Sequence, residues 1–210
     1  MKITCKSTLL PFVGTQFVVE TTAENLKWGI YQGQLAEGHA QGIVSWGDGT
    51  VETVTNLTRK THTYPAPGRY TVKLSDDFGT LAVSVNVKTF DYYKVYAPMV
   101  REFHTTAENM TSFGNYFLMN GLNLTVLDLR APNIRVLKAD GFKGCASLTG
   151  ELAFPFVTSL TGVMPPFREC MGGITKIRFP ESAEAAITGS QVYRNDPTLG
   201  TGTAVCEFNL

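Results

Sequence analysis

The sequence predicts a mainly β protein in two parts: a β-sandwich over residues 1–90 and a short β-solenoid over residues 91–210. Two observations support this prediction. Before position 91, short apolar segments alternate with turn residues at the spacing of a sandwich. After it, the chain matches itself at intervals of about 23 to 25 residues, which is typical of stacked repeats. With 43% hydrophobic residues, the 210-residue chain can bury a core in both parts.

The charge balance and the length of the apolar runs exclude some classes of partner. Eighteen basic residues balance 18 acidic ones, and no run of like charge is long enough to form a tract. We therefore expect neither nucleic acid nor an anionic membrane as the main partner. The longest apolar runs, such as residues 9–13 and 152–157, are too short to cross a bilayer, so we expect no membrane insertion. Residues 1–6 lack the apolar core of a signal peptide, which predicts either no export by that route or a mature fragment behind a new methionine.

The first part predicts strands joined by recognisable turns. Gly47-Asp48-Gly49 supplies a hairpin turn into the β-branched segment 50–55, and Pro67-Gly68 marks a second turn. Residues 76–79 form a third turn, before a strand that places Leu81, Val83, Val85 and Val87 on one face. The strands predicted here cover residues 17–19, 43–46, 70–74 and 81–87.

Two linked motifs resemble a known family. The pattern WGDGT, followed by HTYPAPGRYTV, resembles the polycystic kidney disease (PKD) domain. That resemblance implies an immunoglobulin-like β-sandwich, a module that recurs as a spacer or interaction domain on surface proteins and is seldom an enzyme. It also implies a structural role for the motif residues, which are Trp46, Gly47, Asp48, Gly49, His62, Tyr64, Gly68 and Tyr70.

The second part contains an internal repeat. Residues 142–155 match residues 167–180 at a separation of 25 positions, and a looser copy runs from Phe117 to Pro132 with Asn120 in place of the cysteine. The other half of each unit begins at Pro98, Pro132 and Pro155. This spacing of leucines predicts one short strand per turn, stacked on the next. The repeat positions predicted to fill the core are Phe142, Cys145, Leu148, Leu152, Phe154, Phe167, Cys170, Ile174, Ile177 and Phe179.

This repeat resembles the BspA-like branch of the leucine-rich repeats over residues 95–210. Members of that branch occur on bacterial and protist surface proteins and on some phage proteins. Three to four coils are visible, the pattern is lost at residues 183–186, and residues 204–210 are predicted as a last strand. Because short solenoids need caps, we expect the sandwich to cover one end and residues 189–203, or another chain, to cover the other.

The cysteines and carboxylates leave two alternatives open. Cys145 and Cys170 should lie one rung apart, as a disulfide or, as we prefer, as stacked buried thiols. Asp48 either satisfies its own turn, which we prefer, or binds calcium with help from other carboxylates. The candidates for that help are Glu52, Asp76 and Asp77. We expect no metal and no cofactor.

Catalytic patterns are missing from the sequence, and we expect no enzyme. His39 and His104 are isolated, and His62 belongs to the packing motif. Tyr92, Tyr93 and Tyr96 are expected to pack at the junction of the two parts. Trp28 and Tyr31, in a loop-rich polar stretch, are predicted to form a contact surface.

These expectations combine into a functional hypothesis. The chain is a non-enzymatic binding or structural protein at an exposed surface, and its best match is a phage virion component of the tail, fibre or capsid decoration. Its partners would be other structural subunits or a host-surface protein or glycan, and it can form a homo-oligomer. A secreted or cell-surface bacterial adhesin without its leader is the alternative, and a glycan-binding accessory module of a larger enzyme is a second one.

Overall fold

The computed structural model describes residues 13–84, 92–171 and 173–210, and these are mainly β. The expectations for Val85, Val87 and the boundary at residues 90–91, and for the side chains of Tyr92 and Tyr93, concern residues or side chains outside the described part of the chain. The strands are β1 (Thr15–Thr21), β2 (Lys27–Ile30), β3 (Gln32–Leu35), β4 (Gly42–Ser45), β5 (Val51–Val54), β6 (Lys60–Thr63), β7 (Gly68–Leu74), β8 (Phe78–Ala82), β9 (Val100–Thr105), β10 (Ser112–Phe113), β11 (Val126–Leu129), β12 (Val136–Lys138), β13 (Gly150–Ala153), β14 (Ser159–Thr161), β15 (Ile174–Phe179) and β16 (Val205–Phe208).

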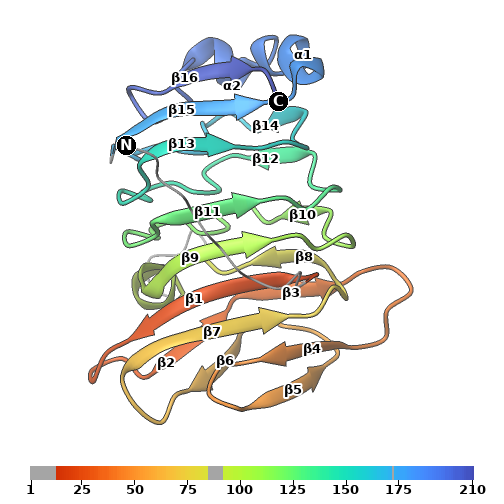
Figure 1. The fold of residues 1–210 in the computed structure, drawn as a ribbon, viewed down its shortest axis with the longest axis vertical. Coiled ribbons are helices and arrows are strands. Elements are labelled where there is room, and N and C mark those ends of the chain that lie inside the picture. The colour runs from red at the N-terminus through yellow and green to blue at the C-terminus, as the bar shows by residue number, and fades with distance from the viewer. Residues whose placement is uncertain (1–12, 85–91, 172) are drawn as a thin grey trace, which may run out of the picture.

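The main sheet runs through both parts of the chain. Its strand order is β11-β9-β1-β7-β4-β5, and β9 pairs antiparallel with β1 but parallel with β11. Beyond β11, the parallel strands β13, β15 and β16 continue up the same side of the molecule (Figure 1). The sheet therefore changes from antiparallel to parallel at β9, and the N-terminal strands cover the near end of the stacked turns as expected.

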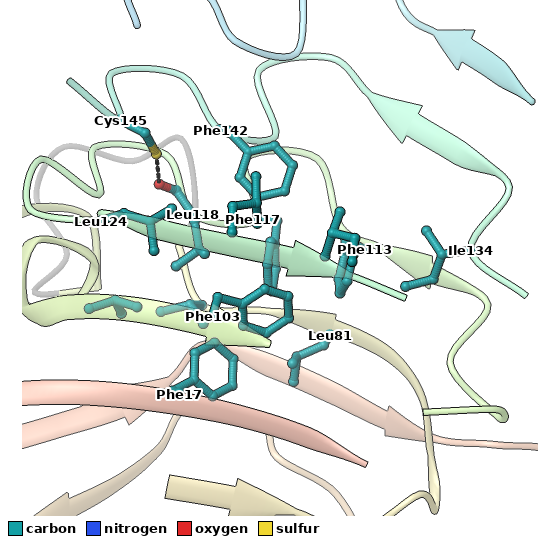
Figure 2. Packing of buried hydrophobic residues seen from close by; sticks show 14 of the residues in the cluster. Phe17, Leu81, Phe103, Phe113, Phe117, Leu118, Leu124, Ile134, Phe142 and Cys145 are labelled. Atoms are coloured by element: carbon teal, nitrogen blue, oxygen red, sulfur yellow. Dashed lines mark hydrogen bonds between the residues drawn. The ribbon is translucent and has the colours of Figure 1, made fainter. Parts of the chain in front are cut away.

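A second layer of strands lies behind the main sheet. It contains the sheet β3-β8-β10 and the pair β12-β14, while β2 pairs separately with β6. Between the layers lies one cluster of buried hydrophobic residues that extends from Phe17 to Ala204. Figure 2 shows its middle, where the ring centroids of Phe17 and Phe103 are 4.8 Å apart and those of Phe103 and Phe117 are 4.9 Å apart. Sheet and core are thus continuous across the two parts.

The predicted strands of the first part are present, but the sequence missed three others. β1, β4, β5 and β7 overlap the predicted segments, and Trp46 N–H donates to the Thr50 carbonyl to close the Gly47 to Gly49 turn. The strand predicted over residues 81–87 begins earlier, because β8 runs from Phe78 to Ala82, so the third turn ends before residue 78 and not at 79. A Cβ on Gly47, whose φ is +89°, would lie 2.7 Å from the Thr71 backbone nitrogen, so this position requires glycine. The missed strands are β2, β3 and β6, all short and interrupted by glycine or polar residues.

The repeat residues are buried as predicted. All ten predicted core positions from Phe142 to Phe179 are at most 5% exposed, and the rings of Phe142 and Phe167 stack at 5.3 Å. The turns of chain that begin at β11 and β13 each supply one strand to the main side and one to the second layer, whereas the turn that begins at β15 supplies helices in place of the second strand (Figure 1). A turn of this kind is called a coil below.

Two details of the predicted repeat are wrong. The unit beginning at Pro98 forms β9 in the main sheet, whereas those at Pro132 and Pro155 form β12 and β14 in the second layer. A short strand with apolar residues at alternate positions fits either place, so spacing alone could not separate them.

The second detail is the residue that replaces the cysteine. Gly121 N–H donates to Leu118 as Cys145 N–H donates to Phe142 and Cys170 N–H to Phe167. Gly121, not Asn120, therefore occupies the cysteine position, because the first coil is one residue shorter. A Cβ on Gly121 would lie 3.2 Å from Cys145 Sγ, so the small residue makes room for the next thiol.

Short helices close one end of the stack and join the two parts. Where the repeat pattern is lost, the chain forms the helices that pack against β14 with Ala183, Ile187, Val192 and Leu199 buried. The segment thus caps the second layer, and β16 remains the last strand of the main side (Figure 1). The helices are η1 (Tyr92–Tyr96), η2 (Ala97–Met99), η3 (Glu181–Ala183), α1 (Glu184–Thr188) and α2 (Gln191–Asn195).

Candidate binding surfaces

The Asp48 turn is an internally satisfied cluster. Asp48 Oδ1 accepts from Thr50 N–H at 3.0 Å, and Oδ2 lies 2.7 Å from His62 Nε2. Burial acts to raise the pKa of Asp48, but the hydrogen bonds from His62 and Thr50 outweigh it, and the pKa is lowered. The carboxylate, only 8% exposed, therefore holds its turn and the neighbouring strand β6 together.

Aromatic rings surround this turn. Trp46 stacks on His62 at 5.0 Å, His62 meets Tyr64 edge-on at 4.8 Å, and Tyr64 stacks on Tyr70 at 4.0 Å. The Tyr64 hydroxyl is buried without a hydrogen-bond partner, and burial raises its pKa. These motif residues lie in one packed unit, which is the arrangement expected of a structural motif. Together with Asp48 they are called the Trp46 cluster below.

The carboxylates considered for calcium are engaged elsewhere. Glu52 accepts from Trp46 Nε1 at 2.9 Å and pairs with Lys60, which lowers its pKa. Asp77 pairs with His39 at 2.8 Å, and Asp76 accepts from Asn109 N–H at 2.9 Å. Within the described ranges, no group of three or more His, Cys, Asp or Glu residues is placed to hold a metal ion.

Cys145 and Cys170 are free, buried thiols in successive coils. Cys145 Sγ donates to the Leu118 carbonyl at 3.4 Å, as the dashed line in Figure 2 shows, and Cys170 Sγ donates to the Phe142 carbonyl at 3.0 Å. Burial, together with the neighbouring Cys170, raises the pKa of Cys145. Each thiol therefore bonds to the preceding coil, as the preferred alternative predicted, and no disulfide joins them.

The predicted contact residues do not form an exposed surface. Trp28 lies in β2, is 0% exposed, and donates from Nε1 to the Tyr96 carbonyl at 3.0 Å. The prediction that Trp28 is exposed is therefore wrong. Gly29 interrupts the apolar pattern of β2, so the sequence did not indicate that Trp28 lies in a buried strand. Tyr31 is half-buried against the core, with the Arg59 guanidinium 6.0 Å from its ring centre. Tyr96, in contrast, is buried at the junction as predicted.

The outward side of the main sheet and of β13, β15 and β16 forms a long surface on one side of the molecule, called the outer face below (Figure 1). Its alternate positions carry opposite charges that pair across strands. His104, which the sequence left isolated, lies 3.3 Å from Glu102 on its own strand and 3.5 Å from Asp128 on β11. The hydrogen bond to Asp128 raises the pKa of His104. Burial acts in the opposite direction, and the hydrogen bond to Glu102 adds to the increase. The other ion pairs of the outer face are Arg69 with Glu102, Arg101 with Glu20, Arg130 with Asp128, Arg178 with Glu151, and Lys176 with Glu207.

Concave sites are shallow by comparison. A depression of about 350 Å³ lies between β8 and the loop of residues 106–111, lined by Glu37, Thr80, Glu108 and Asn109 among others. A smaller one of about 160 Å³ lies beside Gln32 and Lys138. Glu37 and Glu108 line the larger depression and are both exposed, so this depression presents carboxylates to solvent.

Comparisons with known proteins identified no relative. No family model, no curated protein and no solved structure matches the chain. Among the described residues, the helices are all too short or too polar to span a bilayer.

Proposed function

We propose that the protein is a non-enzymatic binding or assembly protein at an exposed surface, with a PKD-like immunoglobulin sandwich followed by a short BspA-like leucine-rich repeat. The observation that carries this proposal is the outer face, which is formed by two successive sheets on one side of the molecule and runs from β5 to β16 (Figure 1). Its charged side chains are held in cross-strand pairs, such as Arg178 with Glu151 and Lys176 with Glu207.

Pre-ordered side chains favour recognition by a flat partner. Binding normally costs about 0.5–1.5 kcal/mol for each flexible side chain that becomes fixed. On the outer face that ordering is largely complete before a partner arrives, because Glu102, His104 and Asp128 already restrain one another. A protein or glycan surface can therefore dock with a small entropic cost.

The outer face replaces Trp28 and Tyr31 as the proposed contact surface. Its centre, where β1, β9 and β11 meet, combines the outward residues Val18, Glu102, His104 and Asp128. Both charge signs and apolar contact area are present there, which suits a protein or glycan partner better than a polyanion. Partners on this proposal are other structural subunits or a host-surface protein or glycan.

Among exposed locations, we propose the surface of a phage virion. The resemblance of both parts to modules of surface and phage proteins supports a tail, fibre or capsid-decorating role. The alternatives are a bacterial adhesin supplied without its leader and a glycan-binding accessory module of a larger enzyme.

Immunogold electron microscopy separates these alternatives. Antibodies against the purified chain are applied to intact cells of the source culture and to particles that are released on lysis and purified by density gradient. Gold on the particles is the expected result. Gold on the cell surface instead favours the adhesin. Protein confined to the soluble cell contents in both samples would refute the surface role, and a glycan array tests the third alternative.

A further inference from the structure

The outermost strand of the stacked side, β16, is an open edge. β16 follows β15 in the order β13-β15-β16, and no strand of the described residues pairs with its other side. Residues 205–208 make no other backbone hydrogen bond within the described part of the chain. Of the helices that follow β15, α1 and α2 pack on β14 in the second layer, whereas η3 contacts β16 without a backbone hydrogen bond to its residues. Half of the backbone groups of β16 thus remain available to a further strand.

Usual protections against edge pairing are weak on β16. Val205 is 60% exposed, and the only charge in the strand, Glu207, is bound by Lys176 at 2.8 Å. Natural edges are more often protected by a free lysine, a proline or a bulge. None of these interrupts Val205–Phe208.

We propose that β16 pairs antiparallel with β16 of a second copy of this chain, about a two-fold axis that passes Cys206 perpendicular to the sheet. This inference names a partner for the proposed assembly role and rests on it. Such an axis keeps outward residues outward, so each residue pairs with a counterpart on the same face. Centred on Cys206, it sets Val205 opposite Glu207 of the second copy.

Charge complementarity selects this register. In the present sheet Glu151 is opposite Lys176, and Lys176 is opposite Val205. The row that crosses the proposed interface then carries Glu151, Lys176 and Val205 of one copy, followed by Glu207 and Arg178 of the other. Negative and positive charges alternate along it, separated by one valine.

Neighbouring registers are poorer. An axis at Glu207 places the two Glu207 carboxylates directly opposite each other, and like charges in that position are destabilising. An axis at Val205 pairs only the first two residues of the strand. The opposite edge strand, β5, has no comparable row, because its outward positions Val51 and Thr53 face Ser45 and Ile43.

Two substitutions at position 205 test the proposal in opposite directions. Val205→Glu places a carboxylate opposite Lys176 in the monomer, which is favourable, and opposite Glu207 of the second copy, which is unfavourable. Val205→Lys does the reverse. Because two symmetric like-charge pairs form, Val205→Glu should raise the dimer Kd roughly tenfold or more, whereas Val205→Lys should leave it similar or lower. The matched control is Val51→Glu on β5, since Val51 is 61% exposed.

The measurement is light scattering over a concentration series for the wild type and the three variants, with melting curves to confirm folding. We expect a two-chain mass, twice 23.0 kDa, for the wild type, Val205→Lys and Val51→Glu, and a shift towards 23.0 kDa for Val205→Glu. A wild type that stays monomeric, or a dimer broken by Val51→Glu but not by Val205→Glu, would overturn the inference. Binding of another protein or a glycan by a monomeric wild type would still support the proposed function.

Discussion

The antiparallel half, strands β1 to β8, and the stacked half, strands β9 to β16, meet in the main sheet and share one hydrophobic core. They are stabilised in different ways. In the antiparallel half, the Trp46 cluster gathers Asp48, His62, Tyr64 and Tyr70 at one place. In the stacked half, the same contact recurs from coil to coil, as when Phe142 stacks on Phe167. The comparison teaches that a turn motif concentrates stability in a few side chains, whereas a repeat spreads it over every coil.

The stacked half also uses side-chain bonds to the backbone of the preceding coil. Ser147 Oγ donates to the Leu122 carbonyl at 2.6 Å, and Thr175 Oγ1 donates to the Gly150 carbonyl at 3.1 Å, each across 25 residues. Similar bonds join Asn123 to Pro98 and Asn133 to Glu108. These bonds fix the vertical register of the coils, because each ties a side chain to the carbonyl directly beneath it.

The largest predicted effect concerns the shared rings of the stack. Phe167→Ala removes a fully buried ring that contacts both Phe142 and Phe154, so the free energy of unfolding should fall by roughly 3–5 kcal/mol. Chemical denaturation measures it. Met171→Ala, at a side chain 74% exposed, is the control and should change stability by less than about 0.5 kcal/mol. Equal stability of the two variants would refute the packing of the coils.

In the antiparallel half, Asp48→Ala should lower the free energy of unfolding by about 1–3 kcal/mol, because the Thr50 N–H and His62 lose the charged carboxylate that accepts their hydrogen bonds. Asp48→Asn keeps one acceptor oxygen and should cost less. The same denaturation experiment measures both changes. If alanine and asparagine were equally harmless, Asp48 would not be a structural residue of the turn.

A smaller effect is expected for a single bond between coils. Ser147→Ala removes the hydroxyl that donates to Leu122 and should lower the free energy of unfolding by about 0.5–1.5 kcal/mol. Ser147→Thr retains a hydroxyl and should recover most of the loss. An alanine variant as stable as the wild type would show that this bond contributes nothing to the stacking.

The smallest effect is a pH dependence at the strand where the halves meet. His104 gains Asp128 and Glu102 as partners on folding, so its folded pKa is raised above the unfolded value of about 6.5. Its contribution is therefore complete below about pH 6.5 and is lost as pH rises through the folded pKa. Denaturation midpoints across this range should fall less in His104→Gln than in the wild type. Identical pH dependence of stability in the wild type and in His104→Gln would contradict the pairing of His104 with Asp128 and Glu102.

Local signals in the sequence predicted much of the fold. Gly47-Asp48-Gly49 favours a hairpin because glycine adopts the positive φ found at positions 47 and 49. Phe142 and Phe167 indicate the repeat because they occupy equivalent positions in adjacent coils. Both features depend on residues close in sequence or on a fixed interval. The burial of the ten repeat positions followed directly from that interval.

Features that depend on distant partners could not be predicted in this way. Trp28 is buried because Tyr96, 68 residues later, accepts its N–H. His104 seemed isolated because its second carboxylate, Asp128, belongs to the next strand of the sheet. Gly121 was missed because the first coil is one residue shorter, so Leu118 and not Phe117 stands at the position of Phe142. The proposed contact surface changed for the same reason, since cross-strand pairs become visible only when the strands are placed.

The measurement that tests the central claim is scanning calorimetry of the full chain, of Phe167→Ala and of Asp48→Ala. If β1 and β9 join the halves into one sheet and one core, each protein should melt in a single transition with equal calorimetric and van't Hoff enthalpies. Both substitutions should lower that same transition. Two transitions, one shifted only by Phe167→Ala and the other only by Asp48→Ala, would contradict the account and establish two independent domains.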